Sequence, residues 1–177
     1  MATQPAFDKT VSVEEYLSTV YEHDCEYVDG VVEERDTGEF EHAYVQGLLV
    51  TLFNNHRNDW GVYALPEQRV QTQKNRYRVP DVVVLRVGSV RGPILTHPPI
   101  LAIEVQSPDQ SLRYTEAKAM EYLAFGVEYV WVIDPYARVP YRCTTSSLEL
   151  VRTGDLSITG TPIQIVPDEL FVQLDQI

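Results

Sequence analysis

Three runs of β-branched and aromatic residues in the middle of the chain constrain its fold more than any other feature. They lie at residues 77–87, 100–106 and 127–134, and such residues favour buried or half-buried strands. Between the last two runs, residues 111–125 predict a helix that Gly126 ends as a C-terminal cap. A strand, a helix and a second strand form a crossover unit, which joins parallel strands. The pattern therefore predicts an α/β or α+β fold with helices flanking a mixed central β-sheet.

The N-terminal part of the chain predicts two helices and a hairpin. Ser12 begins a capping box, which indicates a short helix at about 12–22. The Asp29-Gly30 pair, between two β-like runs, is typical of a two-residue hairpin turn. Apolar residues at spacings of three and four predict a long helix over 39–59. Its expected core-facing stripe is Phe40, Ala43, Tyr44, Gly47, Leu48, Thr51 and Leu52.

The remaining segments predict further strands and no second domain. A chain of 177 residues fits one domain with its own core, and neither a repeat nor an interdomain linker is visible, so we expect a single domain over 1–177. Pro80 cannot donate to a strand ladder and should lie at a strand start or at an unpaired position. The further expected segments are a strand at 61–70, a loop at 88–98, a hairpin at 138–152 and short strands at 156–159 and 163–166.

The charge of the chain is unusual, both in its total and in its distribution. The sequence has 14 Lys and Arg against 26 Asp and Glu, a net charge of −12, which taken alone argues against a nucleic-acid partner. The segment from Arg69 to Lys118, however, contains eight basic residues and only four acidic ones. If the protein binds nucleic acid, this net-positive segment is where we expect the contact. The alternative is an acidic surface that only keeps the protein soluble.

The sequence favours a cytoplasmic location. Its first residues do not form a secretory signal, and no apolar run approaches the roughly 20 residues of a membrane helix, so no membrane partner is expected. Cys25 and Cys143 lie in no zinc-binding spacing and form no disulfide framework. We therefore expect two reduced thiols.

Two carboxylates interrupt the predicted strands. Asp81 lies in the run Val-Pro-Asp-Val-Val-Val, and Glu104 lies in Leu-Ala-Ile-Glu-Val. A charge in such a strand is costly unless it is paired or bound to a metal. On neighbouring strands the two carboxylates would repel each other, and a divalent ion such as Mg²⁺, which prefers hard oxygen ligands, would remove that repulsion. The simpler alternative is that each side chain points to water from an exposed strand face.

Four further polar residues could complete a site. Gln106 shares a strand face with Glu104 and could orient a water molecule, and Lys118 on the next helix could reach back over the sheet. Glu26 belongs to the early hairpin and His42 to the long helix. Each also has an ordinary structural explanation, as a strand-end, solvated or packed side chain. Zinc-protease, phosphate-loop and nucleophile-elbow motifs are absent from the sequence.

Six segments, in order and at suitable spacing, resemble one known family. They run from about residue 11 to 140, and together they look like the Uma-type family of endonucleases, in the PD-(D/E)xK restriction-endonuclease-like superfamily. The resemblance implies a restriction-endonuclease-like fold. The segments are EYVDG (26–30), His42, VPDVVVL (79–85), PPILAIEVQSPDQS (98–111), Lys118–Tyr122 and GVEYVWVIDP (126–135).

The resemblance also implies roles for particular residues. Asp81 and Glu104 match the acidic residues of the superfamily motif and would bind Mg²⁺ or Mn²⁺, with the Val105 carbonyl and Glu26 as further ligands. The superfamily lysine would fall at position 106, where this chain has Gln106, and its expected replacement is Lys118. His42 matches the family's helical histidine. By resemblance alone, a homodimer is also expected.

These expectations lead to a first hypothesis with two rivals. The leading hypothesis is Mg²⁺-dependent hydrolysis of DNA phosphodiester bonds. In it, Arg76, Arg78 and Arg113 would contact the DNA backbone. The family often has an aspartate four residues before the helical lysine, where this chain has Tyr114, although Glu116 lies nearby. That departure favours the first rival, a catalytically silent binding or assembly module. The second rival is a metal-independent hydrolase that uses the two carboxylates as an acid/base pair.

Overall fold

The fold is built around a six-stranded mixed sheet. The computed structural model describes residues 10–35 and 38–177. Of the sheet's neighbouring pairs, β7 and β8 are parallel and the others are antiparallel, which confirms the predicted mixed sheet and crossover unit. In spatial order the strands are β10 (Leu148–Leu150), β9 (Val139–Cys143), β8 (Tyr129–Asp134), β7 (Leu101–Val105), β6 (Val82–Arg86) and β3 (Val62–Pro66).

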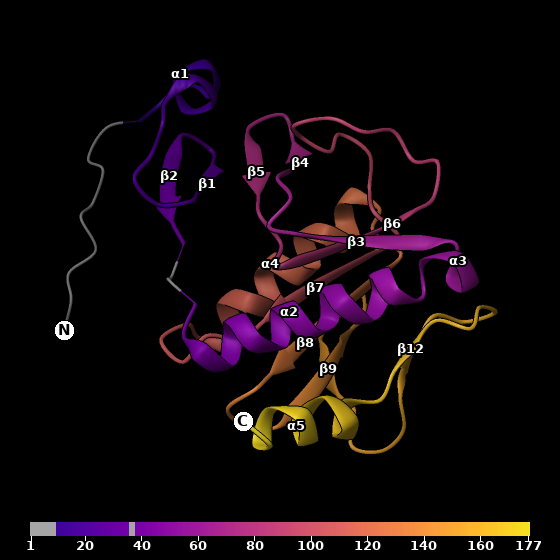
Figure 1. The fold of residues 1–177 in the computed structure, drawn as a ribbon. Coiled ribbons are helices and arrows are strands. Elements are labelled where there is room, and N and C mark those ends of the chain that lie inside the picture. Colours follow the sequence, from indigo (N-terminus) through magenta and orange to yellow (C-terminus); the bar gives the residue numbers. More distant parts are fainter. Residues whose placement is uncertain (1–9, 36–37) are drawn as a thin grey trace.

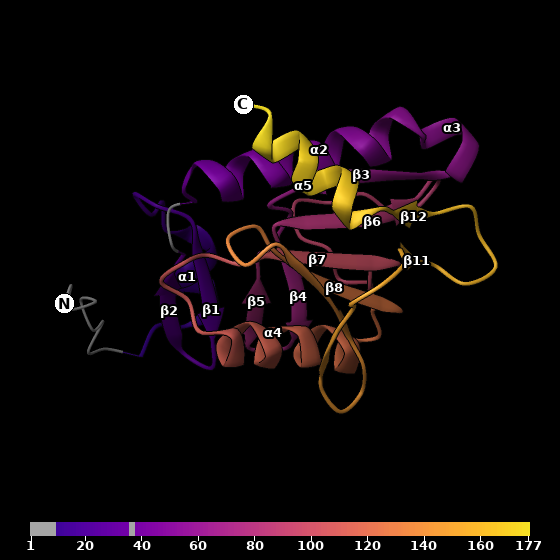
Figure 2. The same ribbon diagram turned by 90° about the horizontal axis from the view of Figure 1, so that it is seen from below.

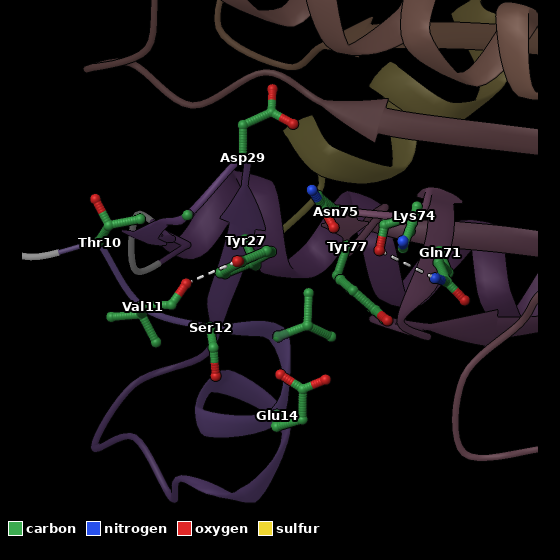
Figure 3. A pocket seen from close by; sticks show the side chains of 12 residues that line it. Thr10, Val11, Ser12, Glu14, Tyr27, Asp29, Gln71, Lys74, Asn75 and Tyr77 are labelled. Carbon is green, nitrogen blue, oxygen red and sulfur yellow. Dashed lines mark hydrogen bonds between the residues drawn. The ribbon is translucent and has the colours of Figure 1, made fainter.

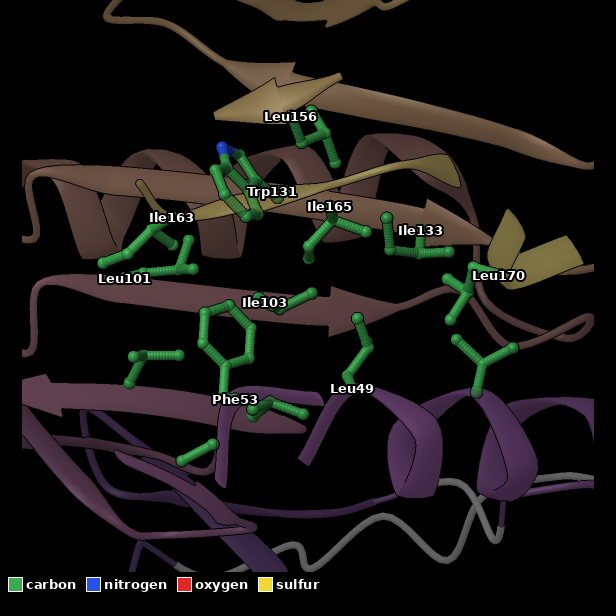
Figure 4. Close-up of a cluster of buried hydrophobic side chains, with 14 of the residues drawn as sticks. Leu49, Phe53, Leu101, Ile103, Trp131, Ile133, Leu156, Ile163, Ile165 and Leu170 are labelled. Atoms are coloured by element: carbon green, nitrogen blue, oxygen red, sulfur yellow. The ribbon is translucent and has the colours of Figure 1, made fainter. Parts of the chain in front are cut away.

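Helices cover both faces of this sheet (Figures 1 and 2). α2 (Phe40–Asn55) and α5 (Pro167–Asp175) lie on one face, and α4 (Leu112–Phe125) lies on the other. α4 begins and ends as predicted, because the Ser111 side chain caps its first turn and Gly126 takes a left-handed conformation after its last. Between α2 and the sheet lies the main apolar core, in which side chains of α2, β7 and β8 pack together (Figure 4).

A second, four-stranded sheet carries the N-terminal hairpin. Its strands, in spatial order, are β2 (Val31–Glu34), β1 (Cys25–Val28), β5 (Arg76–Arg78) and β4 (Val70–Gln73). β1 and β2 pair through the predicted turn, where Asp29 and Gly30 both have positive φ. The short helix α1 (Val13–Ser18) packs on this sheet, and the Tyr16 hydroxyl donates to the Cys25 carbonyl at 2.7 Å.

The two strands predicted at 61–70 and 77–87 are each divided between the two sheets. Residues 61–70 and 77–87 do not form one strand pair: β3 and β6 belong to the larger sheet, and β4 and β5 belong to the smaller. The break falls at Val79–Asp81, because Pro80 has no N–H to continue a ladder. The chain therefore crosses from one sheet to the other immediately before Asp81.

The predicted core-facing stripe of the long helix was wrong. The helix ends at Asn55, a short α3 (Arg57–Trp60) follows, and the buried residues of α2 are His42, Val45, Leu49 and Phe53. Apolar side chains surround most of the circumference of α2, so spacing alone did not decide which face meets the sheet. Four members of the expected stripe are exposed: Phe40, Ala43, Gly47 and Thr51.

The C-terminal segment contains a helix that the sequence analysis missed. The predicted short strands are β11 (Leu156–Ser157) and β12 (Gln164–Ile165), which pair with each other. α5 then begins with Pro167 in its first turn and buries Leu170, Phe171 and Leu174 against the core. At the other end of the chain, α1 stops at Ser18, four residues before the predicted end.

Two smaller expectations concern cysteines and membranes. Cys25 and Cys143 are buried, and neither forms a disulfide. Among the described residues, no helix has the length and apolar character needed to cross a membrane.

Candidate active site

The predicted site residues come together where the two sheets and α4 meet. Asp81 follows the crossing between the sheets and lies beside β7, because β6 and β7 pair with Val82 opposite Ile103. Glu104 lies on β7, Glu26 on β1, Lys118 on α4 and His42 on α2. All five side chains are buried, with exposed fractions between 2% and 7%. The alternative in which Asp81 and Glu104 point to water from an exposed strand face is therefore wrong.

Asp81 is held by donors from three directions. Its Oδ2 accepts from the Val105 N–H at 2.7 Å and lies 3.3 Å from His42 Nε2. Its Oδ1 accepts from Arg35 Nη2 at 2.7 Å, and its backbone carbonyl accepts from Gln46 Nε2 at 2.9 Å. The orientation of Asp81 is thus fixed by β7, by α2 and by the residue that follows β2.

Glu104 and Glu26 share the ammonium group of Lys118. Lys118 Nζ lies 2.9 Å from Glu104 Oε2 and 3.0 Å from Glu26 Oε1. The other oxygen of Glu104 accepts from the Tyr122 hydroxyl at 2.7 Å. Glu26 also accepts from the Val79 N–H at 2.9 Å. The lysine therefore connects β1, β7 and α4 in a single buried cluster.

A buried arginine, Arg78, also belongs to the cluster. Arg78 donates to Glu26 Oε2 at 2.8 Å and to Glu121 Oε2 at 3.0 Å. The Arg78 side chain is only 8% exposed, so it is part of the protein interior. Arg76 also pairs with Glu121 and with Asp29. Of the three arginines expected to contact a DNA backbone, Arg78 is therefore buried in ion pairs, Arg76 is 31% exposed, and Arg113 is exposed.

The ionisation of the cluster follows from its pairings. Burial opposes charge on Asp81, but His42, Arg35 and Lys118 together hold the pKa of Asp81 below its ordinary value. Burial raises the pKa of Glu104, and the charges of Asp81 and Glu26 add to the rise in spite of Lys118. Burial opposes charge on Lys118 too, yet Glu104 and Glu26 raise its pKa. Lys118 is therefore a permanent cation at neutral pH.

His42 has little room to move. Burial opposes its charged form, but the hydrogen bond with Asp81 and the negative charge of Asp81 together raise the pKa of His42. A β-carbon added to Gly38 would lie only 2.7 Å from His42 Nδ1, so glycine at that position makes space for the ring. His42 and Gln46 lie four residues apart on α2, and both side chains reach Asp81.

Gln106 directly follows β7, and its side chain contacts the loop before α4 and the first turn of that helix. Its Nε2 donates to the carbonyls of Ser107 and Gln110, and its Oε1 accepts from the Thr115 hydroxyl at 2.7 Å. Both ends of the amide are therefore used to hold the loop before α4. These contacts position the helix that carries Lys118.

Tyr114 and Glu116 lie apart from the two strand carboxylates. The Tyr114 hydroxyl donates to Glu33 Oε2 at 2.9 Å, and burial raises the pKa of Tyr114 to about 12. Glu116 accepts from the Leu148 N–H at 3.1 Å, next to β10. Glu116 therefore does not reach the carboxylate cluster and does not compensate for Tyr114 there.

Sequence reasoning missed Arg35, Tyr122 and Glu121. Tyr122 and Glu121 follow Lys118 by four and three residues on α4, so helical spacing could have placed all three near one face. Arg35 has no such signal. It follows β2 directly and meets Asp81 only because the small sheet folds against the large one.

The donor chemistry of the cluster fits a divalent metal ion. Asp81, Glu104 and Glu26 offer carboxylate oxygens, the ligand type that Mg²⁺ and Mn²⁺ prefer. Burial, together with the charges of Asp81 and Glu26, raises the pKa of Glu104, and a bound cation would favour its charged form. Within residues 10–35 and 38–177, no group of three His, Cys, Asp or Glu side chains is arranged so that it could hold a metal ion. Arg35 occupies Asp81 Oδ1, and Lys118 lies between the two glutamates.

A separate shallow pocket lies on the small sheet. Its volume is about 650 Å³, and Tyr27, Lys74 and Tyr77 are among the residues that line it (Figure 3). None of the clustered acidic side chains reaches it. We therefore place the candidate chemistry at the carboxylate cluster, which the charges and contacts favour.

The buried carboxylates predict a loss of stability in acid. Burial opposes charge on Glu26, but Lys118 and Arg78 lower its pKa, so the folded state binds fewer protons than the unfolded state below about pH 4.3. The resulting stability is present above that pH and is lost as the pH falls through the lowered pKa of Glu26. In Glu26→Gln, the fall in the urea unfolding midpoint between pH 6 and pH 3 should be smaller than in the wild type. Glu128→Gln, at an exposed pair, should behave like the wild type.

Comparisons with known proteins identify the fold and the family. A comparison with curated proteins finds no match. Among solved structures, the chain is similar to a crystal structure titled as a "putative nuclease belonging to DUF820" from Anabaena variabilis ATCC 29413. The TM-score is 0.81 at 20% identity, over 93% of this chain and 99% of that one, which shows a common fold. Residues 13–171 match the Uma2 family, described as "Putative restriction endonuclease", and the chain therefore belongs to the Uma2 family.

Proposed function

We propose that the protein is a metal-dependent endonuclease that hydrolyses DNA phosphodiester bonds at the buried carboxylate cluster. Membership of a family described as restriction endonucleases supports a nuclease. The observation that carries the proposal is the convergence of Asp81, Glu104, Glu26 and Lys118 from four separate elements. Three buried carboxylates are costly to assemble, and a site that binds a cation gives a physical reason to keep them.

Each side chain has a role that its contacts support. Asp81 and Glu104, with Glu26 and the Val105 carbonyl, would hold Mg²⁺ or Mn²⁺, which supplies charge stabilisation at the phosphate and a more acidic bound water. Lys118 keeps its proton and so supplies fixed positive charge rather than acting as a base. His42 and Tyr122 orient Asp81 and Glu104 respectively. Gln106 positions the start of α4.

The expected substrate contact lies at the start of α4. Arg113 is exposed in the first turn of this helix, five residues before the buried Lys118. An exposed arginine there could hold a DNA phosphate without reading sequence. With a net charge of −12, non-specific binding should be weak and should fall steeply with salt.

Removing the metal tests the proposal. The purified protein should cleave plasmid or single-stranded DNA in Mg²⁺ or Mn²⁺, and EDTA should reduce the rate by about a hundredfold or more, since metal catalysis supplies several kcal/mol. The measurement is the initial rate of strand breakage with and without chelator, followed by restoration with excess Mn²⁺. Cleavage that survives EDTA unchanged would support a metal-independent hydrolase instead.

A silent binding module is the second candidate. The observation that favours it is that Arg35 and Lys118 already neutralise the carboxylates without any metal. In that case, calorimetry would detect no Mn²⁺ binding at millimolar concentration, and no cleavage would occur. The same protein sample can be used for both measurements.

A further inference from the structure

Arg35 is placed between the buried cluster and the protein surface. Its Nη2 lies 2.7 Å from Asp81 Oδ1, which is inside the cluster. Its Nη1 faces outward, 3.3 Å from Glu67 Oε1 and 3.9 Å from Asp24 Oδ2. The Arg35 side chain is 14% exposed, whereas Asp24 and Glu67 are 57% and 47% exposed. One guanidinium group therefore bridges a buried acid and a pair of surface acids.

A divalent ion and Arg35 would compete for the same oxygen. The Arg35 guanidinium is a permanent cation, and its bond to Asp81 is short and charge-assisted. An ion on Asp81 Oδ1 would have to displace Nη2, and two cations at that point would repel each other. Lys118 presents no such obstacle at Asp81, because it pairs with the two glutamates.

The surface acids give Arg35 an alternative position. If Arg35 releases Asp81, Glu67 and Asp24 are already within 4 Å of its other nitrogen, so the guanidinium would keep ion-pair partners at the surface. Neither of these acids contacts the inner cluster through its side chain, although the Glu67 N–H donates to the Asp81 carbonyl. The exchange thus needs only a movement of the Arg35 side chain.

We propose that Arg35 sets the metal affinity of the site by occupying Asp81 in the metal-free protein and moving to Glu67 and Asp24 when a divalent cation binds. Arg35 is a positioning residue in this proposal, which rests on the proposed function of the cluster. It follows that removing Arg35 should strengthen metal binding. Removing the outer acids should weaken metal binding, but only while Arg35 is present.

The test is Mn²⁺ binding by calorimetry to the whole chain. Arg35→Ala should bind Mn²⁺ about tenfold more tightly than the wild type, or more, because it removes a charge-assisted hydrogen bond that competes with the ion. Arg35→Gln, which keeps most of the side-chain volume, should bind with intermediate affinity. Glu67→Gln should bind about threefold more weakly than the wild type, and the same substitution in the Arg35→Ala background should have no effect.

Several controls separate this exchange from a general effect of charge. Arg86→Ala removes an exposed arginine whose side chain pairs with Glu128 at 3.5 Å, and its Mn²⁺ affinity should equal that of the wild type. Urea unfolding of each variant shows that the fold is retained. Equal or weaker binding by both Arg35 variants would overturn the proposal. An equal effect of Glu67→Gln in both backgrounds would also overturn it, because the acid would then act through its charge alone.

Failure of this inference is distinguishable from failure of the nuclease assignment. If the wild type cleaves DNA only with metal, and Arg35→Ala binds Mn²⁺ no more tightly, the exchange is wrong and the nuclease function stands. If neither protein binds Mn²⁺ nor cleaves DNA, the proposed function fails and this inference fails with it.

Discussion

An Asp81→Asn variant is expected to cleave DNA about a thousandfold more slowly than the wild type, or more slowly still. Asp81 is fixed by the Val105 N–H, His42 and Arg35, so its carboxylate is held in one orientation beside Glu104. Asparagine has nearly the same shape but no negative charge, so it is a much weaker ligand for a hard divalent cation. A loss of about 4 kcal/mol of transition-state stabilisation corresponds to a thousandfold in rate. The measurement is the initial rate of plasmid nicking in Mn²⁺.

Matched variants show whether the loss belongs to the site. Glu104→Gln should lose a comparable factor, because Glu104 is the second strand carboxylate of the cluster. Glu128→Gln removes an exposed carboxylate that pairs with Arg86, and its rate should stay within about twofold of the wild type. Circular dichroism and urea unfolding check that Asp81→Asn remains folded at the assay temperature. If Asp81→Asn retained more than a tenth of the wild-type rate, the cluster could not be the catalytic site.

The two carboxylates could be found from sequence because their neighbours are so apolar. Asp81 and Glu104 are each 3% exposed and lie within buried stretches of chain. The strand pattern indicated this burial, which is energetically costly for a charged side chain without a partner. The hairpin at Asp29 and the cap at Gly126 were equally readable, because both positions have positive φ that favours particular residues. Local chemistry of this kind does not depend on the rest of the fold.

The missed features depend on packing between distant segments. Phe40 and Val45 both belong to apolar series on α2, but only Val45 faces the sheet, since α5 and the sheet together determine the orientation of the helix. Arg35 carries no local pattern at all, and its partner Asp81 is 46 residues away. Spacing rules apply within one element, so they could not predict an ion pair between two sheets.

The uneven charge along the chain is explained by the same packing. The positive segment from Arg69 to Lys118 supplies Arg76, Arg78 and Lys118, and most of their acidic partners lie outside that segment. These bases are therefore used within the molecule rather than presented to a polyanion. The exposed bases of the segment are Lys74, Arg86, Arg91 and Arg113, which is half of its eight basic residues. The net charge thus describes the outer surface, while the cluster inside is nearly balanced.

Replacing Arg78 with methionine should destabilise the protein by about 3–5 kcal/mol, the usual cost of removing one partner from a buried ion pair. Arg78 donates to Glu26 at 2.8 Å and to Glu121 at 3.0 Å, and all three side chains are nearly fully buried. Methionine fills much of the same volume. The loss would therefore come from the two carboxylates that lose Arg78 as a partner, rather than from a cavity. Urea unfolding at pH 7 measures the change. Arg113→Ala, at an exposed arginine, should differ from the wild type by less than about 0.5 kcal/mol.

A double variant identifies the source of that loss. Glu26 would keep Lys118 and the Val79 N–H in Arg78→Met, whereas Glu121 would keep only the more exposed Arg76 and the Thr72 hydroxyl. Adding Glu121→Gln should therefore recover part of the lost stability, because a neutral amide needs no buried cation. If the double variant were less stable than Arg78→Met, the loss would lie in packing rather than charge. Wild-type stability in Arg78→Met itself would mean that the ion pairs of Arg78 add nothing to the stability of the fold, and Arg78 would then be available to bind a phosphate.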